Sequence, residues 1–259
     1  MGTTRALCGR SSRDDLKEML VRLRRGLLGR VKQPIYVESN PYLAGFVEVL
    51  GEVFEGAWVV HVVRDPRTYV RSGVNFGAFR GMKKFAAQWW PDWFPKPEKR
   101  EVSRQKTEDR RPSPQPSPGV PGEGAGGAPG EGVRGEGLKW GEMDAIERLA
   151  WFWSLVNSYL NRGEKVYGQR YLRIRFEELF WGGGLERLTD WMGLARSSAM
   201  REEATREKVN ASKGGELPEW EKWCGGDQHK VLRHCETLMR MYGYLKEENA
   251  QKHQAVEVS

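Results

Sequence analysis

The sequence predicts an α/β fold in which a parallel sheet is covered by helices on both faces. The strongest indication is residues 58–63, a nearly continuous apolar run rich in β-branched residues, which is typical of a strand buried on both faces. Residues 172–176 indicate a second strand, with alternating polarity, after a long apolar helical segment. A length of 259 residues suits one such domain with a sizeable core. We therefore expect a single domain.

A helix is expected directly after the first strand. Asp65 suits the N-cap and Pro66 the first helical position, where a missing N–H costs nothing, so the helix should run from about Pro66 to Asn75. Arg64 then sits at the carboxyl end of the strand, where open α/β sheets bind ligands. Ser72 follows Asp65 by about two helical turns, so it lies on nearly the same face and can point back toward the guanidinium of Arg64.

An arginine and a hydroxyl on one edge suit a phosphate, and Arg67 and Arg71 add positive potential. The run Arg64-Asp65-Pro66, followed by five residues and Ser72, resembles the 3′-phosphate-binding motif of sulfotransferases that use 3′-phosphoadenosine 5′-phosphosulfate (PAPS), written R-D/N-P-x-x-x-x-x-S. The alternative is that Arg64 only pairs with Asp65 or another nearby carboxylate.

At the N-terminus, Gly2, Thr3 and Thr4 resemble the end of the 5′-phosphosulfate loop of the same family, R/K-S-G-T-T/R. In that loop, backbone N–H groups and a helix N-terminus hold the anion, and a basic residue neutralises the bridging oxygen. The front half of the loop is missing, and Met1 stands where the family has Ser. The sequence then either starts downstream of the true start or carries a degenerate loop, and a coincidental tripeptide is a further alternative.

Residues 14–30 have apolar side chains three and four apart and predict an amphipathic helix capped by Ser12 or Asp14. Residues 35–37 suggest a brief buried strand ending at Glu38. Heparan-type sulfotransferases have an E-K-S-P segment at the equivalent place, lining the acceptor site, so the resemblance makes Glu38 the first candidate for a general base. The alternative is a loop carboxylate paired with an arginine. His61 is a candidate by residue type alone, and its apolar strand predicts a packed core histidine.

The residue composition changes twice in the middle of the chain. Residues 42–54 have helical spacing, and residues 76–95 are dense in aromatics that suit a core, a lid or stacking on bases. Residues 96–137 are rich in Pro, Gly, Ser, Glu and Arg and predict a disordered insertion, because they cannot bury enough apolar surface to offset their ordering entropy. Residues 1–95 and 138–246 should therefore form the domain, followed by a polar tail at 247–259.

The second half continues the resemblance. Residues 140–161 predict a long apolar helix, and the pattern W-x-W-x-x-x-N (Trp151, Trp153, Asn157) before a strand ending in Arg-Phe-Glu-Glu-Leu at 175–179 is similar to the same sulfotransferases. Further helices are expected near 185–192 and at about 227–242, with a stop at Gly243. The family often closes a basic loop over the nucleotide, so the resemblance makes Lys213, which precedes two glycines, a phosphate contact.

The net charge and the cysteines indicate which kinds of ligand and metal the chain could bind. A net charge of +7 and a pI near 9.3 suit an anionic ligand, which could be a nucleotide, a sulfated or acidic sugar, a nucleic acid or a membrane surface, and charge alone does not choose among them. With the resemblance to sulfotransferases we expect a nucleotide rather than nucleic acid. The three cysteines lack the spacing of a zinc site and their odd number argues against a disulfide framework, so no metal is expected. No apolar run approaches the roughly 20 residues of a membrane span, and no secretory signal is visible, so we expect a soluble, cytoplasmic protein.

The resemblance implies a P-loop-type, sulfotransferase-like fold and a PAPS-dependent enzyme. The sulfuryl group would pass in line from PAPS to a hydroxyl or amine of a carbohydrate, a small molecule or a protein. The alternative is a catalytically weak or inactive protein of the same fold that binds a nucleotide, RNA or a protein partner, and the incomplete loop favours it.

Overall fold

The computed structural model describes residues 12–29, 32, 35–79, 140–196, 202 and 217–245. Gly2, Thr3, Thr4 and Lys213, the predicted insertion 96–137, the tail 247–259 and residues 80–95 lie outside these ranges. The elements, with η marking 3₁₀ helices, are α2 (Arg13–Leu28), η1 (Pro41–Phe46), α3 (Val47–Val53), β1 (Val59–Val63), α4 (Pro66–Asn75), α6 (Ala145–Tyr167), η3 (Gly168–Arg170), β2 (Tyr171–Arg175), α7 (Phe176–Trp181), α8 (Gly184–Trp191), η4 (Trp220–Lys222) and α10 (Gly225–Met241).

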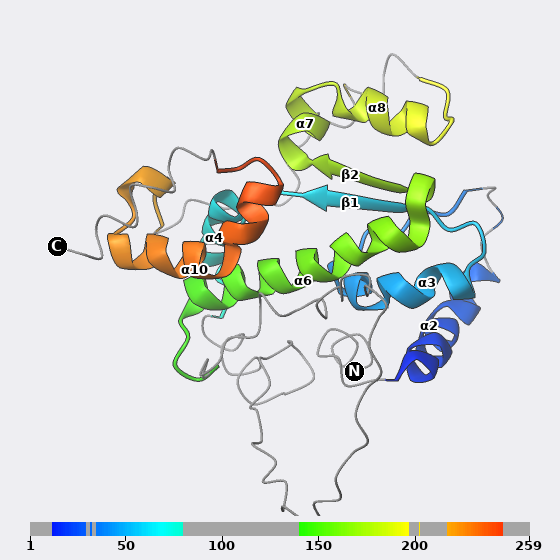
Figure 1. The fold of residues 1–259 in the computed structure, drawn as a ribbon, viewed down its shortest axis with the longest axis horizontal. Coiled ribbons are helices and arrows are strands. Elements are labelled where there is room, and N and C mark those ends of the chain that lie inside the picture. The colour runs from blue at the N-terminus through cyan, green and yellow to red at the C-terminus, as the bar shows by residue number, and fades with distance from the viewer. Residues whose placement is uncertain are drawn as a thin grey trace, which may run out of the picture.

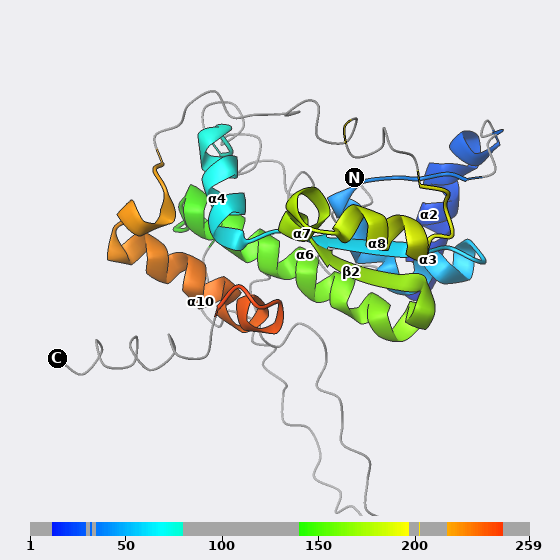
Figure 2. The ribbon, with the colours of Figure 1, turned by 90° about the horizontal axis from the view of Figure 1, so that it is seen from above.

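The two predicted strands are confirmed to within one residue, and they pair in parallel. Val59 lies opposite Tyr171 and Val63 opposite Arg175, and β1 and β2 make up the sheet in the described ranges. Helix α6 runs along one face of the pair and α8 lies over the opposite face (Figures 1 and 2). Helices α4 and α10 lie beyond the carboxyl ends of the strands, and α2 and α3 lie toward the amino ends (Figure 1).

Helix α6 is the central element of the core. It begins at the N-cap Asp144, whose side chain accepts a hydrogen bond from the backbone N–H of Glu147, and it packs against α3, α4 and α10. Most of its first half is buried, including Trp151 and Trp153. The crossing with α4 depends on Gly73, because a Cβ there would lie 2.8 Å from Cδ1 of Leu149. A helix that is apolar nearly all round is thus explained by partners on several sides.

Strand β1 is buried on one face only, so the expectation of two buried faces is wrong. His61 and Val63 are buried, whereas Val60 and Val62 are 36% and 43% exposed. Successive strand residues point to opposite faces, and α6 packs on both strands while α7 and α8 pack on β2. Within the described ranges the outer face of β1 therefore lacks a covering helix of its own.

The predicted strand at residues 35–37 is also wrong, since residues 35–40 carry no helix or strand. Ile35, Tyr36 and Val37 are exposed, at 55%, 41% and 78%. A β-strand is stabilised by pairing with a neighbour, and in the described sheet neither β1 nor β2 forms a ladder with this segment. The helix expected at residues 42–54 begins instead as the 3₁₀ helix η1, capped by Asn40, before α3 continues it.

The other helices expected from periodicity are confirmed with boundary changes of one or two residues, except that α6 begins at Ala145 rather than at 140 and continues to Tyr167 rather than ending at 161. Ser12 caps α2, because its Oγ accepts a hydrogen bond from the backbone N–H of Asp15 at 3.1 Å. Helix α10 ends before Gly243, which has a φ of 75°, the left-handed conformation that glycine adopts most easily. None of the described helices is long and apolar enough to cross a bilayer.

Candidate functional site

The junction between β1 and α4 forms as its local sequence predicts. The side chain of Asp65 accepts a hydrogen bond from the backbone N–H of Arg67 at 2.8 Å and caps α4, and Pro66 occupies the first turn. The apolar run of β1 ends one residue earlier, because Arg64 follows Val63. Arg64 is therefore held at the carboxyl end of a parallel strand, immediately before a helix N-terminus.

Arg64 has no acidic partner among the described residues. Its Nε donates to Oγ1 of Thr68 at 3.1 Å, and its guanidinium carbon lies 5.1 Å from the ring centroid of Phe176. Asp65, which could have paired with it, instead binds Arg67, whose Nη2 lies 2.6 Å from Oδ2. This hydrogen bond raises the pKa of Arg67. The positive charge of Arg64 is thus available at the strand end, whereas that of its neighbour is already matched.

Thr68, rather than Ser72, is the hydroxyl in contact with Arg64. Oγ1 of Thr68 accepts from Arg64 and donates to the backbone oxygen of Asp65 at 3.0 Å. Ser72 is half-buried one turn farther along the same helix face, and no hydrogen bond joins it to Arg64. Sequence reasoning missed Thr68, although its spacing of four from Arg64 was visible. The two hydroxyls together extend the polar face that Arg64 begins.

Residues from distant parts of the chain close over this junction. The hydroxyl of Tyr244 lies 2.8 Å from Oε2 of Glu177 and 3.1 Å from the backbone oxygen of Val63. Arg67 donates through Nη2 to the backbone oxygen of Tyr244 at 3.2 Å. Burial raises the pKa of Tyr244, so its hydroxyl stays a donor at neutral pH. The turn after α10 and the start of α7 thereby hold the exit of β1 in place.

A buried neutral network supports the junction from the α6 side. Asn157 donates through Nδ2 to the backbone oxygen of Trp153 at 2.7 Å, so its Oδ1 is the acceptor for Nε2 of His61, also at 2.7 Å. Nδ1 of His61 must then accept from the hydroxyl of Tyr171 at 2.6 Å. Burial lowers the pKa of His61 to about 4. The predicted core histidine is confirmed, and at neutral pH it is uncharged.

The W-x-W-x-x-x-N pattern therefore has a structural meaning in this chain. Trp153 donates through Nε1 to the backbone oxygen of Arg64 at 2.9 Å, and Asn157, one turn later, binds His61. Both residues project from α6 toward β1. They fix the end of the strand and its middle by hydrogen bonds from uncharged groups. Among the residues that the structure describes, the guanidinium of Arg64 then has Thr68 and Phe176 as its partners.

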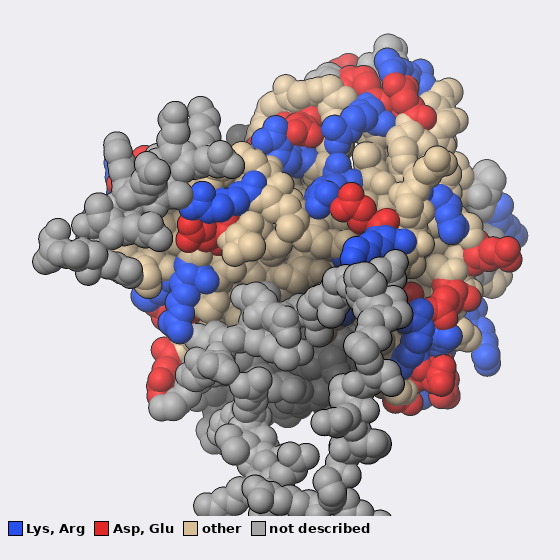
Figure 3. Space-filling view, viewed as in Figure 1, with Lys and Arg blue, Asp and Glu red and all other residues tan. Residues whose placement is uncertain are grey.

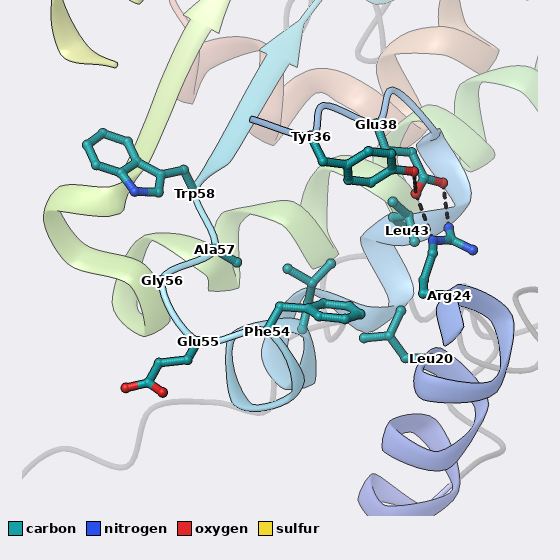
Figure 4. Close-up of a pocket in the computed structure, with 11 residues that line it drawn as sticks. Leu20, Arg24, Tyr36, Glu38, Leu43, Phe54, Glu55, Gly56, Ala57 and Trp58 are labelled. Atoms are coloured by element: carbon teal, nitrogen blue, oxygen red, sulfur yellow. Dashed lines mark hydrogen bonds and ion pairs between the residues drawn. The ribbon is translucent and has the colours of Figure 1, made fainter. Parts of the chain in front are cut away.

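Glu38 lies in a different environment, a pocket of about 310 Å³ that also involves α2 and the turn leading into β1. Its carboxylate binds Nε of Arg24 at 2.7 Å and Nη2 of the same guanidinium, and the hydroxyl of Tyr36 donates to Oε2 at 3.0 Å (Figure 4). Neither Arg64 nor Ser72 lines this pocket. Glu38 is thus a loop carboxylate paired with an arginine, and its role as a base stays a prediction.

The other predicted site residues, the cysteines and the surface charge do not identify a second binding site. Gly2, Thr3, Thr4 and Lys213 lie outside the described residues, and within the described ranges no group of three or more His, Cys, Asp or Glu side chains could hold a metal ion. Cys224 and Cys235 are free thiols. On the face seen in Figure 3, basic and acidic side chains are interspersed, so the net positive charge is not gathered there into one patch.

Comparison of the chain with models of known families, with curated proteins and with solved structures finds no match in any of the three. The geometry around Arg64 is therefore the basis for a functional assignment.

Proposed function

We propose that this chain is a sulfotransferase-like domain of the P-loop type that binds PAPS and transfers its sulfuryl group to an acceptor hydroxyl or amine. The observation that carries the proposal is Arg64, a guanidinium at the carboxyl end of a parallel strand that has no acidic partner in the described ranges. A charged, forked donor in this position suits the 3′-phosphate of the nucleotide. Thr68 and Ser72 extend the polar face along α4.

In this reaction the bond between sulfur and the bridging phosphate oxygen breaks, and a bond from sulfur to the acceptor oxygen or nitrogen forms. The acceptor proton goes to a base, for which Glu38 is the candidate, and 3′,5′-diphosphoadenosine leaves. The chemistry requires positioning and neutralisation of charge on the leaving phosphate rather than a metal. Gly2, Thr3, Thr4 and Lys213 are the proposed further contacts to the nucleotide. The acceptor is a carbohydrate, a small molecule or a protein.

A second candidate function is nucleotide binding without chemistry. One observation favours it: both carboxylate oxygens of Glu38 are already engaged by Arg24, and one of them also by Tyr36. To accept the proton of an acceptor hydroxyl or amine, Glu38 would have to give up one of these hydrogen bonds. The two candidates share the nucleotide site at Arg64 and differ only in whether sulfate is transferred.

The nucleotide site is tested by calorimetry with 3′,5′-diphosphoadenosine and 5′-AMP, which differ in the 3′-phosphate. Arg64→Ala should weaken binding of the first by about 10-fold to 100-fold, because a charged hydrogen bond contributes about 1.5–3 kcal/mol, and should change binding of the second little. Arg71→Ala is the matched control on the same helix, since Arg71 is paired with Glu219 at 2.6 Å, and it should cost less than about threefold. Equal losses for both nucleotides would remove the assignment to the 3′-phosphate.

Turnover of labelled PAPS with sugar, phenol and peptide acceptors separates the two candidate functions. Sulfate transfer that is lost in Glu38→Gln supports the enzyme and its base. Tight binding of 3′,5′-diphosphoadenosine with no transfer to any acceptor supports the binding protein.

A further inference from the structure

The pocket beside Glu38 is a concave site separate from the edge that presents Arg64. Its walls come from α2, the 35–40 segment, η1, α3 and the turn at residues 54–58, and its volume is about 310 Å³. Figure 4 shows the rings of Tyr36 and Phe54 and the side chains of Leu20 and Leu43 around it, while the side chains of Glu55 and Trp58 point away. The interior is therefore apolar apart from one side.

The polar side of the pocket is electrically neutral. Arg24 and Glu38 form a bidentate pair whose side chains are only 13% and 22% exposed. An additional charge placed here would be partly removed from water, which is costly, because Arg24 and Glu38 already neutralise each other and the side chain of Glu55, the other charged residue of the lining, points away (Figure 4). An anion would also meet the carboxylate of Glu38, and a cation the guanidinium of Arg24. An uncharged ligand is the one that this lining accepts.

Glu38 also specifies the kind of polar group such a ligand needs. A carboxylate offers about four lone-pair sites. Three are used, by Nε and Nη2 of Arg24 and by the hydroxyl of Tyr36. The remaining site can only accept, so the ligand must bring a hydroxyl or an N–H. The volume lies at the lower end of the roughly 300–1,000 Å³ typical of ligand pockets, which limits the apolar body to one or two rings.

We propose that this pocket binds a small uncharged compound with an apolar, ring-containing body and one hydroxyl or N–H that donates to Glu38. Glu38 is the one residue that this site shares with the proposed sulfuryl transfer, and here it serves only as a hydrogen-bond acceptor, so binding in this pocket requires neither the nucleotide nor its site at Arg64. The ring faces of Tyr36 and Phe54 contact the body of the ligand, and the leucines close the base of the pocket.

The test uses 2-naphthol as the probe, with 2-methoxynaphthalene and 2-naphthoate as matched ligands that remove the donor or add a negative charge. Binding is followed by calorimetry and by methyl chemical shifts of leucines in the full chain. We expect saturable 1:1 binding of 2-naphthol, at least about tenfold weaker binding of each of the other two, and shifts confined to the methyl groups of Leu20, Leu43 and Leu50.

Leu43→Trp fills the pocket and should reduce the affinity for 2-naphthol at least about tenfold. Leu185→Trp, the same exchange at a half-buried leucine of α8, is the control and should leave it unchanged. Glu38→Gln should reduce the preference for 2-naphthol over 2-methoxynaphthalene. Should Leu43→Trp fail to fold, the methyl shifts of the unaltered chain still locate the site. No saturable binding of 2-naphthol, equal affinity for all three ligands, or shifts spread over the other leucines would overturn the proposal.

Discussion

Two arginines in this chain occupy opposite situations. Arg24, in the pocket region, holds Glu38 in a bidentate ion pair, and both side chains are largely buried. Arg64, at the sheet edge, has Thr68 and the ring of Phe176 as its partners and no carboxylate in the described part of the chain. The difference lies in what binds each guanidinium: at the edge, Trp153 and Asn157 hold the backbone oxygen of Arg64 and the side chain of His61 by hydrogen bonds between uncharged groups, and the nearby carboxylate of Asp65 binds Arg67 instead.

The comparison of Arg24 with Arg64 shows how a fold can leave the positive charge of an arginine available to bind a ligand. A region stabilised by an ion pair consumes its charge, so Arg24 has little capacity to attract an anion. The charge of Arg64 is not used in this way, because Asp65 pairs with Arg67 and the backbone of Arg64 is held by the uncharged side chain of Trp153, so this charge can serve a ligand. Four changes test this contrast, from the largest expected effect to the smallest.

Asn157→Leu should destabilise the protein by up to about 3 kcal/mol. The exchange leaves Nε2–H of His61 buried without an acceptor, and a buried unsatisfied donor costs about 1–3 kcal/mol. Urea unfolding measures the change. Lys165→Leu, at an exposed position of the same helix, is the comparison and should cost clearly less. Equal stabilities of the two variants would mean that the neutral network does not support the edge.

Acid should weaken the same network. The pKa of His61 is about 4 in the folded protein, below the value of 6.5 for an exposed histidine, so the unfolded state binds the proton more readily. The stability due to neutral His61 is present above pH 6.5 and is lost as the pH falls toward 4. Between pH 7.5 and 5 the loss should be about 2 kcal/mol.

Unfolding of the unaltered chain and of His61→Phe at both pH values isolates this effect. His234, whose pKa is also lowered by burial, contributes equally to both proteins. The slope of stability against pH should be smaller in His61→Phe, and an unchanged slope would contradict the burial argument.

Arg24→Met should destabilise the protein by about 1–2 kcal/mol, because it leaves the carboxylate of Glu38 partly buried and unpaired. This is less than the 3–5 kcal/mol of a fully buried pair. Arg64→Met should change stability by less than about 0.5 kcal/mol, since Arg64 forms no ion pair with any residue that the structure describes. Thermal unfolding compares them, and the double variant Arg24→Met with Glu38→Gln should recover part of the loss. Equal losses of stability in Arg24→Met and Arg64→Met would contradict the proposed difference between the two arginines.

Asp65→Asn should have the smallest effect of the four, a small change in the affinity for the nucleotide. Asparagine caps a helix as well as aspartate does, so α4 should stay intact, but Arg67 loses its ion-pair partner and becomes a second free charge at the edge. Affinity for 3′,5′-diphosphoadenosine should rise about twofold, as expected for a partly exposed charge. Calorimetry at fixed salt checks this, and a fall in affinity would show that Asp65 itself positions the ligand.

The local parts of the fold could be predicted from neighbouring residues. Asp65 and Pro66 fix the start of α4 within three residues of the strand, and the spacing of apolar residues identifies α2, α6 and α10. The strand at residues 35–37 could not be judged this way, because a short apolar run becomes a strand only when another strand pairs with it. The contact between Thr68 and Arg64 could have been predicted from the sequence, since Thr68 follows Arg64 by four residues.

What the sequence by itself determined is thus the β1–α4 junction and the placement of Arg64 at its end, because the strand, the cap and the first helical turn depend on residues within one short stretch. What only the tertiary structure decided is which charges remain free. The partners of His61 and Arg64 on α6 are 96 and 89 residues away, and Arg24 on α2 meets Glu38, which lies 14 residues farther along the chain, on the polar side of the pocket. Such pairings depend on how elements distant in the chain pack together, and no local pattern of residue types encodes them.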